Sequence, residues 1–443
     1  MRNSKSPHSS FSGVSRRSFL RTTAALPILS ALHLDAFAES SEPRSTVFRV
    51  DNCPAHDGQL RHIGVDALLH QLSLHGEKLY KSSQDGVLCD PNGLIAANDV
   101  VILKVNAQWK CRGGTNTDML RGLIHRILQH PDGFHGEVVI FENGQGRPAA
   151  FDGVHCDIDK TEYKPFPELL GKVQVNAEQQ DVTTIDYLVR TVFAGKPVSA
   201  FLMDPHAGVF IADGDHATNG YRRIGTPGTQ CISYPCFTTA GGNRIELRNG
   251  RWTGFDYAQN LKLIHCAVLK DHSGDIGMTG ALKIVYGTLS MQDGTSASRH
   301  YADLGSQCAR MWTEVRSPDL SILDCLWVSY GSTAVNGQPV SGCIGYPPEI
   351  VSRQNILLAG HDPVAIDYYA SKHILLPLGG ENAANHDPDR NPRLVNVYRQ
   401  AQETINASGG VRGRKSKNGD ENIELISTSG LSLAAAQAWS SFA

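Results

Sequence analysis

The sequence predicts an α/β protein with a mainly parallel sheet flanked by helices, built from Rossmann-like βαβ units in two halves of the chain. Two observations support this prediction. Short apolar runs typical of buried strands recur in both halves, and segments with helical periodicity follow several of them after polar or glycine-rich turns. Such units join neighbouring parallel strands through a right-handed crossover.

The clearest unit lies in the first half. Residues 99–105 (DVVILKV) form an apolar run, residues 118–129 (DMLRGLIHRILQ) have the apolar spacing of an amphipathic helix, and residues 137–141 (EVVIF) are a second apolar run. The pattern therefore predicts a strand, a helix and a strand in that order.

The second half repeats the pattern. Apolar runs at 261–269, 319–323 and 355–359 predict strands, residues 281–289 predict a helix, and another helix is expected from Pro363 to about residue 375. Asp362 is the expected N-cap of that last helix, because Pro363 suits the first helical position.

Composition along the chain predicts the domain organisation. We expect residues 39–408 to form one α/β domain of two lobes, at about 95–150 and 256–408, with a turn-rich inserted region at 150–255. Residues 409–443 begin with a run of linker composition (GGVRGRKSKNGDEN), so we expect a linker and a peripheral C-terminal appendage there.

The first 38 residues have the features of a twin-arginine signal peptide. Arg16 and Arg17 precede Phe19-Leu20, an apolar stretch too short to span a bilayer follows, and Ala36-Phe37-Ala38 has the small-x-small form of a cleavage site. We therefore expect the twin-arginine translocation machinery as a partner, and a periplasmic or otherwise extracytoplasmic location. No later apolar run is long enough for a stable membrane span after cleavage.

Charge and cysteine spacing exclude some classes of protein. The chain has a net charge of −3, and removing a signal that holds five basic residues and one acidic residue leaves about −7, which argues against nucleic acid as a partner. The ten cysteines include no CxxC pair, so an iron–sulfur cluster or a zinc ribbon is disfavoured. The sequence also lacks the GxSxG and HExxH motifs of serine hydrolases and zincins.

Polar residues follow the predicted strands. In open parallel α/β sheets the functional crevice lies beyond the carboxyl ends of the strands, so these residues are the candidates for chemistry. Solvated loop residues with no shared site are the alternative. The set consists of Lys104, Asn106, Glu142, Lys270, His272, Asp324 and Asp362.

Two predicted helix starts suit an anion. Gly113-Gly114-Thr115-Asn116-Thr117 precedes the first helix, and Met278-Thr279-Gly280-Ala281-Leu282-Lys283 opens another. Backbone N–H groups, a hydroxyl group and Lys283 can together bind a carboxylate or phosphate. Neither segment is a nucleotide fingerprint, and simple capping and turn roles are the alternative.

Histidine and aspartate side chains leave a metal site open. His272 with Asp324 or Asp362 would be a mixed nitrogen and oxygen ligand set. A hydrogen-bonded histidine and two helix-capping aspartates are the alternative interpretation of the same residues.

These residues resemble the domain-of-unknown-function 362 family. The resemblance rests on Lys104-x-Asn106, Glu142, Lys270-x-His272, residues 279–283 (TGALK), Asp324 and residues 362–367 (DPVAID), which span about 95–375. The family typically has Asn where this chain has Ile284. Some members carry a ferredoxin-like cluster domain, and this chain resembles the exported members without one. The resemblance implies a fold and a polar site, and no particular substrate.

The leading hypothesis is an exported enzyme, dependent on a metal or cofactor of unknown identity, that acts on a small anionic molecule. Lys104, Lys270, His272 and Lys283 are the candidate catalytic residues, with Asn106, Thr115, Glu142 and Thr279 as substrate-binding candidates. Converging lysines repel one another unless an anion or carboxylates compensate them. The alternative is a non-catalytic periplasmic ligand-binding or metal-carrier protein that uses the same crevice.

Overall fold

The computed structural model describes residues 44–55, 60–107, 110–143, 176–178, 183–203, 214–225, 231–272, 276–289, 303–331 and 350–428, and the backbone of three short strands between 334 and 346. Residues 43–443 form one compact unit. The expected signal peptide therefore lies outside the described residues, and so does the end of the chain after residue 428.

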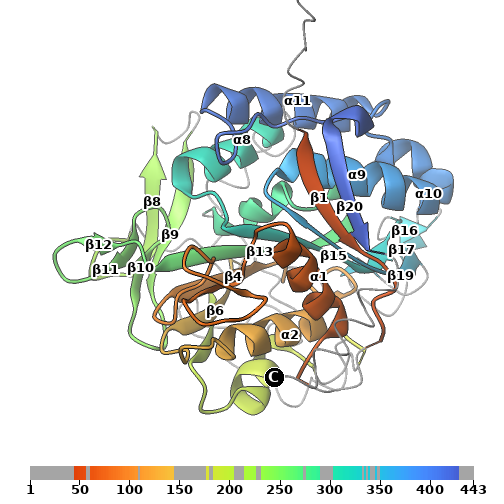
Figure 1. The fold of residues 1–443 in the computed structure, drawn as a ribbon. Helices are drawn as coiled ribbons and strands as arrows, with labels where there is room; N and C mark the ends of the chain where they lie inside the picture. The colour runs from red at the N-terminus through yellow and green to blue at the C-terminus, as the bar shows by residue number, and fades with distance from the viewer. Residues whose placement is uncertain are drawn as a thin grey trace, which may run out of the picture. The chain divides into compact units, whose positions relative to one another are not determined.

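A nine-stranded sheet is the centre of the described fold (Figure 1). Its order is β20 (Ile423–Thr428), β1 (Ser45–Val50), β19 (Val351–Gly360), β15 (Leu320–Ser329), β13 (Leu261–His272), β4 (Val100–Val105), β6 (Glu137–Glu142) and β7 (Val198–Leu202), with β14 (Gly277–Thr279) paired to β13. Every apolar run that the sequence analysis assigned to a strand lies in this sheet.

Most of these strands run in one direction. β4, β6, β7, β13 and β15 are parallel to one another, and β20 is parallel to β1. β19 runs antiparallel to both of its neighbours, and β14 runs antiparallel to β13. The α/β fold class with a mainly parallel sheet is confirmed, and the reversal of β19 has consequences for the site.

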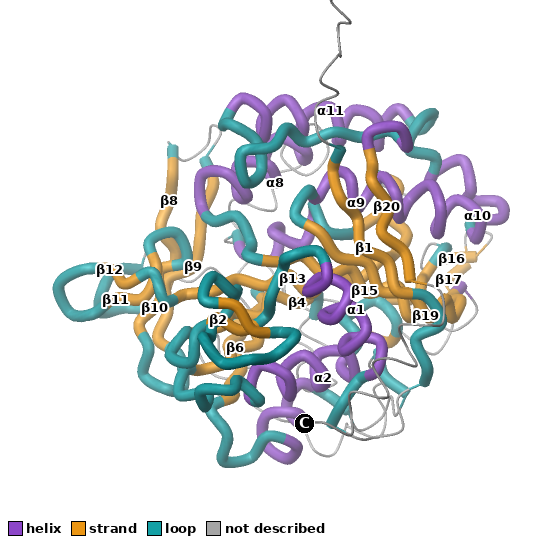
Figure 2. Tube along the Cα trace, viewed as in Figure 1, coloured by secondary structure: helices purple, strands orange, loops and turns teal. Residues whose placement is uncertain are grey.

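Helices cover both faces of the sheet, as Figure 2 shows. On one face, Val101 and Leu103 of β4 pack in a core with α1 (Ile63–Leu74), α2 (Thr117–Leu128), α5 (Ile185–Tyr187) and the π-helix η2 (Leu188–Val192). On the other, Val100 and Ile102 share a core with the 3-10 helix η3 (Lys283–Thr288), α8 (Leu304–Arg310), the π-helix η4 (Met311–Val315), α9 (Pro363–Ala370) and α11 (Pro392–Ala407). The alternation follows from the two-residue period of a strand.

The remaining described elements are short. A five-stranded antiparallel sheet has the order β12 (Tyr257–Ala258), β11 (Gly250–Trp252), β10 (Arg244–Glu246), β9 (Ile232–Thr238) and β8 (Gly220–Ile224). The two-stranded pairs are β2 (Tyr80–Lys81) with β3 (Cys89–Asp90), β5 (Lys110–Cys111) with β18 (Gly345–Tyr346), and β16 (Ala334–Val335) with β17 (Gln338–Pro339). The short helices are η6 (Ser371–Leu375), α10 (Leu376–Leu378), η7 (Gly380–His386) and η8 (Asp420–Asn422).

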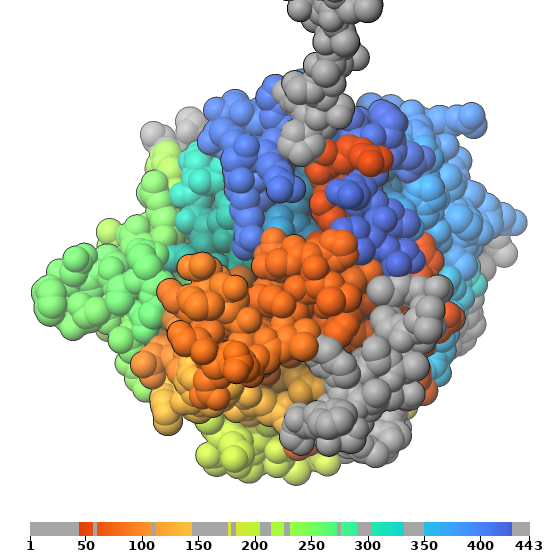
Figure 3. Space-filling model, viewed as in Figure 1, coloured from red at the N-terminus to blue at the C-terminus, as the bar shows by residue number. Residues whose placement is uncertain are grey.

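Two regions that we expected to lie apart from the sheet contribute strands to it. Residues 198–202, placed in an inserted region, form β7 beside β6. Residues 423–428, placed in a peripheral appendage, form the edge strand β20, whose partner is the first described strand, β1. Figure 3 shows the blue C-terminal atoms next to the red N-terminal ones.

Candidate functional site

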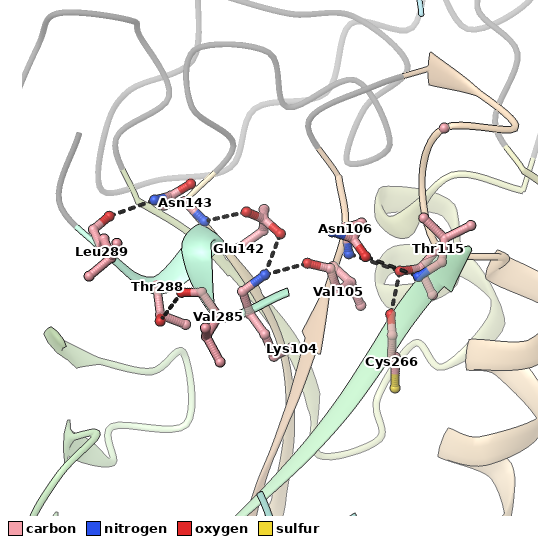
Figure 4. Close-up of polar contacts among 12 residues, drawn as sticks. Lys104, Val105, Asn106, Thr115, Glu142, Asn143, Cys266, Val285, Thr288 and Leu289 are labelled. Carbon is pink, nitrogen blue, oxygen red and sulfur yellow. Dashed lines mark hydrogen bonds and ion pairs between the residues drawn. The ribbon is translucent and has the colours of Figure 1, made fainter. Parts of the chain in front are cut away.

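A buried ion pair joins the ends of β4 and β6 (Figure 4). The Lys104 ammonium group donates to Glu142 Oε2 at 2.6 Å and to the Val105 carbonyl at 2.5 Å. Both side chains are almost completely buried. Burial lowers the pKa of Lys104, and the Glu142 carboxylate opposes this effect. The sequence analysis placed both residues in the site, and the structure brings them into direct contact.

The 3-10 helix η3 packs directly on this ion pair. A Cβ atom at Gly287 would collide with Glu142 and with the Lys104 ammonium group, so only glycine allows the approach. Asn143 fastens the same segment, because its backbone N–H donates to the Gly287 carbonyl at 3.1 Å and its side chain donates to the Leu289 carbonyl at 2.6 Å. The end of η3 is thereby held near the ends of β4 and β6.

Lys270 lies near the end of β13 and is 3% exposed. Its ammonium group donates to the Gly113 carbonyl at 2.5 Å. Burial and the positive charges of Lys283 and Lys104 lower the pKa of Lys270 to about 7, while the Glu142 carboxylate acts in the opposite direction. An amine in this environment exchanges protons near neutral pH, unlike an ordinary lysine.

His272 and Lys283 form a contact beside Lys270. The Lys283 ammonium group lies 3.0 Å from His272 Nδ1, and Thr279 Oγ1 lies 2.9 Å from the same nitrogen. The pairing of β13 with β14 places Thr279 opposite Lys270 and so positions the hydroxyl group. A lysine ammonium group only donates, so this contact assigns the lone pair to Nδ1 and the proton to Nε2.

The first predicted anion site is filled by a carboxylate of the chain itself. Asp324 accepts the backbone N–H of Asn116 at 2.9 Å, the residue that caps α2, and the Asn176 amide at 3.1 Å. Burial raises the pKa of Asp324 to about 7 against the effect of its backbone N–H donors. The sequence analysis considered Asp324 as a metal ligand, whereas here it accepts hydrogen bonds at the start of a helix.

Asn106 and Thr115, two candidates for substrate binding, form hydrogen bonds that connect strands. The Thr115 hydroxyl group accepts from the Asn106 N–H at 2.8 Å and donates to the Cys266 carbonyl at 2.5 Å (Figure 4). Asn106 Oδ1 accepts the backbone N–H of Val268 at 3.0 Å. These bonds tie the end of β4 and the residues before α2 to β13.

The second predicted anion site is also filled. The Asp367 carboxylate of α9 accepts the backbone N–H groups of Ala281 at 2.6 Å and Leu282 at 3.0 Å. A Cβ atom at Gly280 would collide with that carboxylate, which explains the glycine. The segments 279–283 and 362–367 therefore interlock, and their capping role accounts for both motifs.

Asp362 requires a correction. It follows the carboxyl end of β19, and because β19 is antiparallel to β15 it lies where β15 begins, with Gly360 opposite Ser321. There it caps α9 and accepts hydrogen bonds from Ser45 and Ser416. His272 lies at the far end of β13, so the structure does not bring together the proposed metal ligands His272, Asp324 and Asp362. The part of the chain that the structure describes contains no group of three His, Cys, Asp or Glu side chains that could hold a metal ion.

The sequence analysis assigned no role to two buried groups near the site. Arg112 donates to Asn176 Oδ1 at 3.0 Å and lies over the Trp327 ring at 4.0 Å. Asp271 contacts His386 Nε2 at 2.7 Å, with both side chains buried. Arg112 directly precedes Gly113-Gly114, so its position beside a predicted anion site could have identified it from the sequence. His386 and Asn176 lie far from the strand ends in sequence, and no local pattern marks them.

Comparison with known proteins supports the family resemblance for part of the chain. The fold and the lysine-containing strand ends define an α/β protein with a polar site. Residues 247–372 match the family described as Domain of unknown function (DUF362), so this segment belongs to that family. The match includes Lys270, His272, Lys283, Asp324 and Asp362, and Lys104 and Glu142 lie outside it. No curated protein and no solved structure matches the chain.

Proposed function

We propose that the carboxyl ends of β4, β6 and β13 bind a small anionic molecule, and that Lys270 transfers a proton to or from it. The observation that carries this proposal is the environment of the Lys270 amine, which is buried within electrostatic range of two further lysines and has a pKa near 7. A bound anion would offset this repulsion. At neutral pH a large fraction of the amine is unprotonated and can act as a base.

Lys283 and His272 are the groups that we assign to anion binding. Lys283 supplies a positive charge, and its contact with His272 Nδ1 places the imidazole proton on Nε2. Both predicted helix-start sites hold carboxylates of the chain, so side chains must provide the binding groups instead. Lys104 has a different role in this proposal, because its ion pair holds Glu142 close to the site.

The pKa of Lys270 favours an enzyme over a purely ligand-binding protein. A lysine that only binds an anion works best with its charge intact, which an exposed amine ensures at neutral pH. A lowered pKa is typical of lysines that act as bases or nucleophiles. The proposal therefore retains the enzyme hypothesis and the small anionic ligand, and it leaves the reaction and any metal or cofactor open.

Thermal unfolding in phosphate tests anion binding. We expect the Tm to rise with inorganic phosphate relative to chloride of equal ionic strength, because a ligand that binds only the native state stabilises it. Lys283→Met should lose most of the rise. Lys262→Met is the control, since Lys262 lies at the start of β13, at the opposite end from His272, and pairs with Asp319 at 3.8 Å. This variant should keep the rise. Equal phosphate responses in both variants would refute the assignment of Lys283.

We also propose that the protein is exported by the twin-arginine route and works in the periplasm or another extracytoplasmic compartment. The proposal rests on Arg16-Arg17, the short apolar stretch and Ala36-Phe37-Ala38. Among the described residues, no helix has the length and hydropathy of a membrane span. Changing both arginines to lysine should leave the full-length precursor inside the cell, as cell fractionation and immunoblotting would reveal. Normal export of this double variant would contradict the proposal.

A further inference from the structure

A row of polar side chains crosses the otherwise apolar core on the sheet face covered by η4. His265 of β13 is directly opposite Ser321 of β15 and Lys104 of β4, so all three side chains are on the same face of the sheet. Trp312 of η4 packs on this row, with its ring centroid 5.1 Å from that of His265 and the ring planes at 85°.

Three members of this group have polar atoms without a partner. His265, Ser321 and Trp312 are each 0% exposed, yet both ring nitrogens of His265, the Ser321 hydroxyl and the Trp312 indole N–H make no hydrogen bond to any described residue. Leaving one such group unsatisfied costs about 1–3 kcal/mol, and few occur in native proteins. His265 is the neighbour of both other groups, with Ser321 opposite it in the sheet and Trp312 against its ring, and this arrangement points to a shared partner.

The three side chains complement one another as a binding site. Burial and the Lys104 charge hold the pKa of His265 well below its usual value, so the imidazole is neutral and has one donor and one acceptor nitrogen. The Trp312 indole is a donor, and the Ser321 hydroxyl can donate or accept. The edge-to-face contact of the two rings can satisfy at most one N–H group.

We propose that His265, Ser321 and Trp312 form an internal binding site for an ordered water molecule between the sheet and η4. Such a water accepts from an N–H group and donates to the His265 acceptor nitrogen and to Ser321, which matches the roughly three hydrogen bonds that a buried water makes. The site shares no residue with the groups that we assign to anion binding, and Lys104 lies opposite His265 in the sheet. Its water would link β13, β15 and η4 across the core.

A crystal structure at high resolution of the whole mature protein tests the site. We expect a solvent density peak within hydrogen-bond distance of at least two of the three groups. In parallel, Ser321→Ala should lower the Tm by a few degrees and weaken the peak. Ser329→Ala is the matched control, because Ser329 is equally buried on the same strand but its hydroxyl lies 3.5 Å from the Ile350 carbonyl, and this variant should keep the peak.

Two results would overturn the proposal. One is a dry contact in the crystal, with the three groups bonded directly to one another or to the backbone. The other is a higher Tm for His265→Phe or Ser321→Ala, because removing a polar group stabilises a core only when that group has no partner.

Discussion

At the scale of single residues, burial separates the lysines of the candidate site into two kinds. Lys104 has a carboxylate at 2.6 Å, which compensates much of the cost of burying its charge. Lys270 has the Gly113 carbonyl at 2.5 Å and two further lysines within electrostatic range. The sequence indicated both lysines from their position after apolar runs. Which of them has a carboxylate partner depends on residues that are distant in sequence.

Lys270 should make stability depend on pH. Its folded pKa of about 7 lies below the ordinary value of 10.5, so between these values the unfolded chain binds more protons and stability rises with pH. Lys270→Met removes this titration. The difference in free energy of unfolding, variant minus wild type, should therefore be about 2–3 kcal/mol higher at pH 6 than at pH 9. Denaturant titration at the two pH values measures it. If the variant and wild type differ in free energy of unfolding by the same amount at both pH values, the pKa of Lys270 is not lowered.

At the scale of elements, the apolar runs predicted where strands lie but not their direction. The run at 355–359 forms the end of β19, and neither its composition nor its period contains the information that the strand is antiparallel to β15. That single reversal removes Asp362 from the site. β20 was missed for a related reason, because its pairing with β1 joins residues more than 370 positions apart. The helix expected at 281–289 is a short 3-10 helix over Lys283–Thr288.

The interlock between η3 and α9 gives a prediction at the same scale. Gly280→Ala should destabilise the protein by about 2–4 kcal/mol, because the added methyl group would displace the Asp367 carboxylate and leave two buried N–H groups without an acceptor. Gly76→Ala is the control, since a Cβ atom there meets nothing within 4 Å. The control variant should lose about 1 kcal/mol of stability, because Gly76 has a positive φ that alanine adopts at a cost. Chemical denaturation compares the two, and equal losses would contradict the interlock.

At the scale of the whole molecule, the sheet brings distant segments to one place. Lys104 and Glu142 come from the first half of the chain, and Lys270, His272, Thr279 and Lys283 come from the second. The sequence predicted this grouping because parallel strands present their carboxyl ends at one edge. It could not predict that Asp324 and Asp367 fill the two helix starts, since both contacts join residues more than 80 positions apart.

The most direct test of the proposed anion-binding enzyme function is the titration of Lys270 itself. NMR of the protein with lysine labelled at the ε-carbon follows each amine, and Lys270→Met assigns the resonance. We predict a midpoint near pH 7 in chloride and an upward shift when inorganic phosphate is added, because a bound anion favours the charged amine. A midpoint near the ordinary value of 10.5 that phosphate does not move would contradict both the proton-transfer role and the anion site.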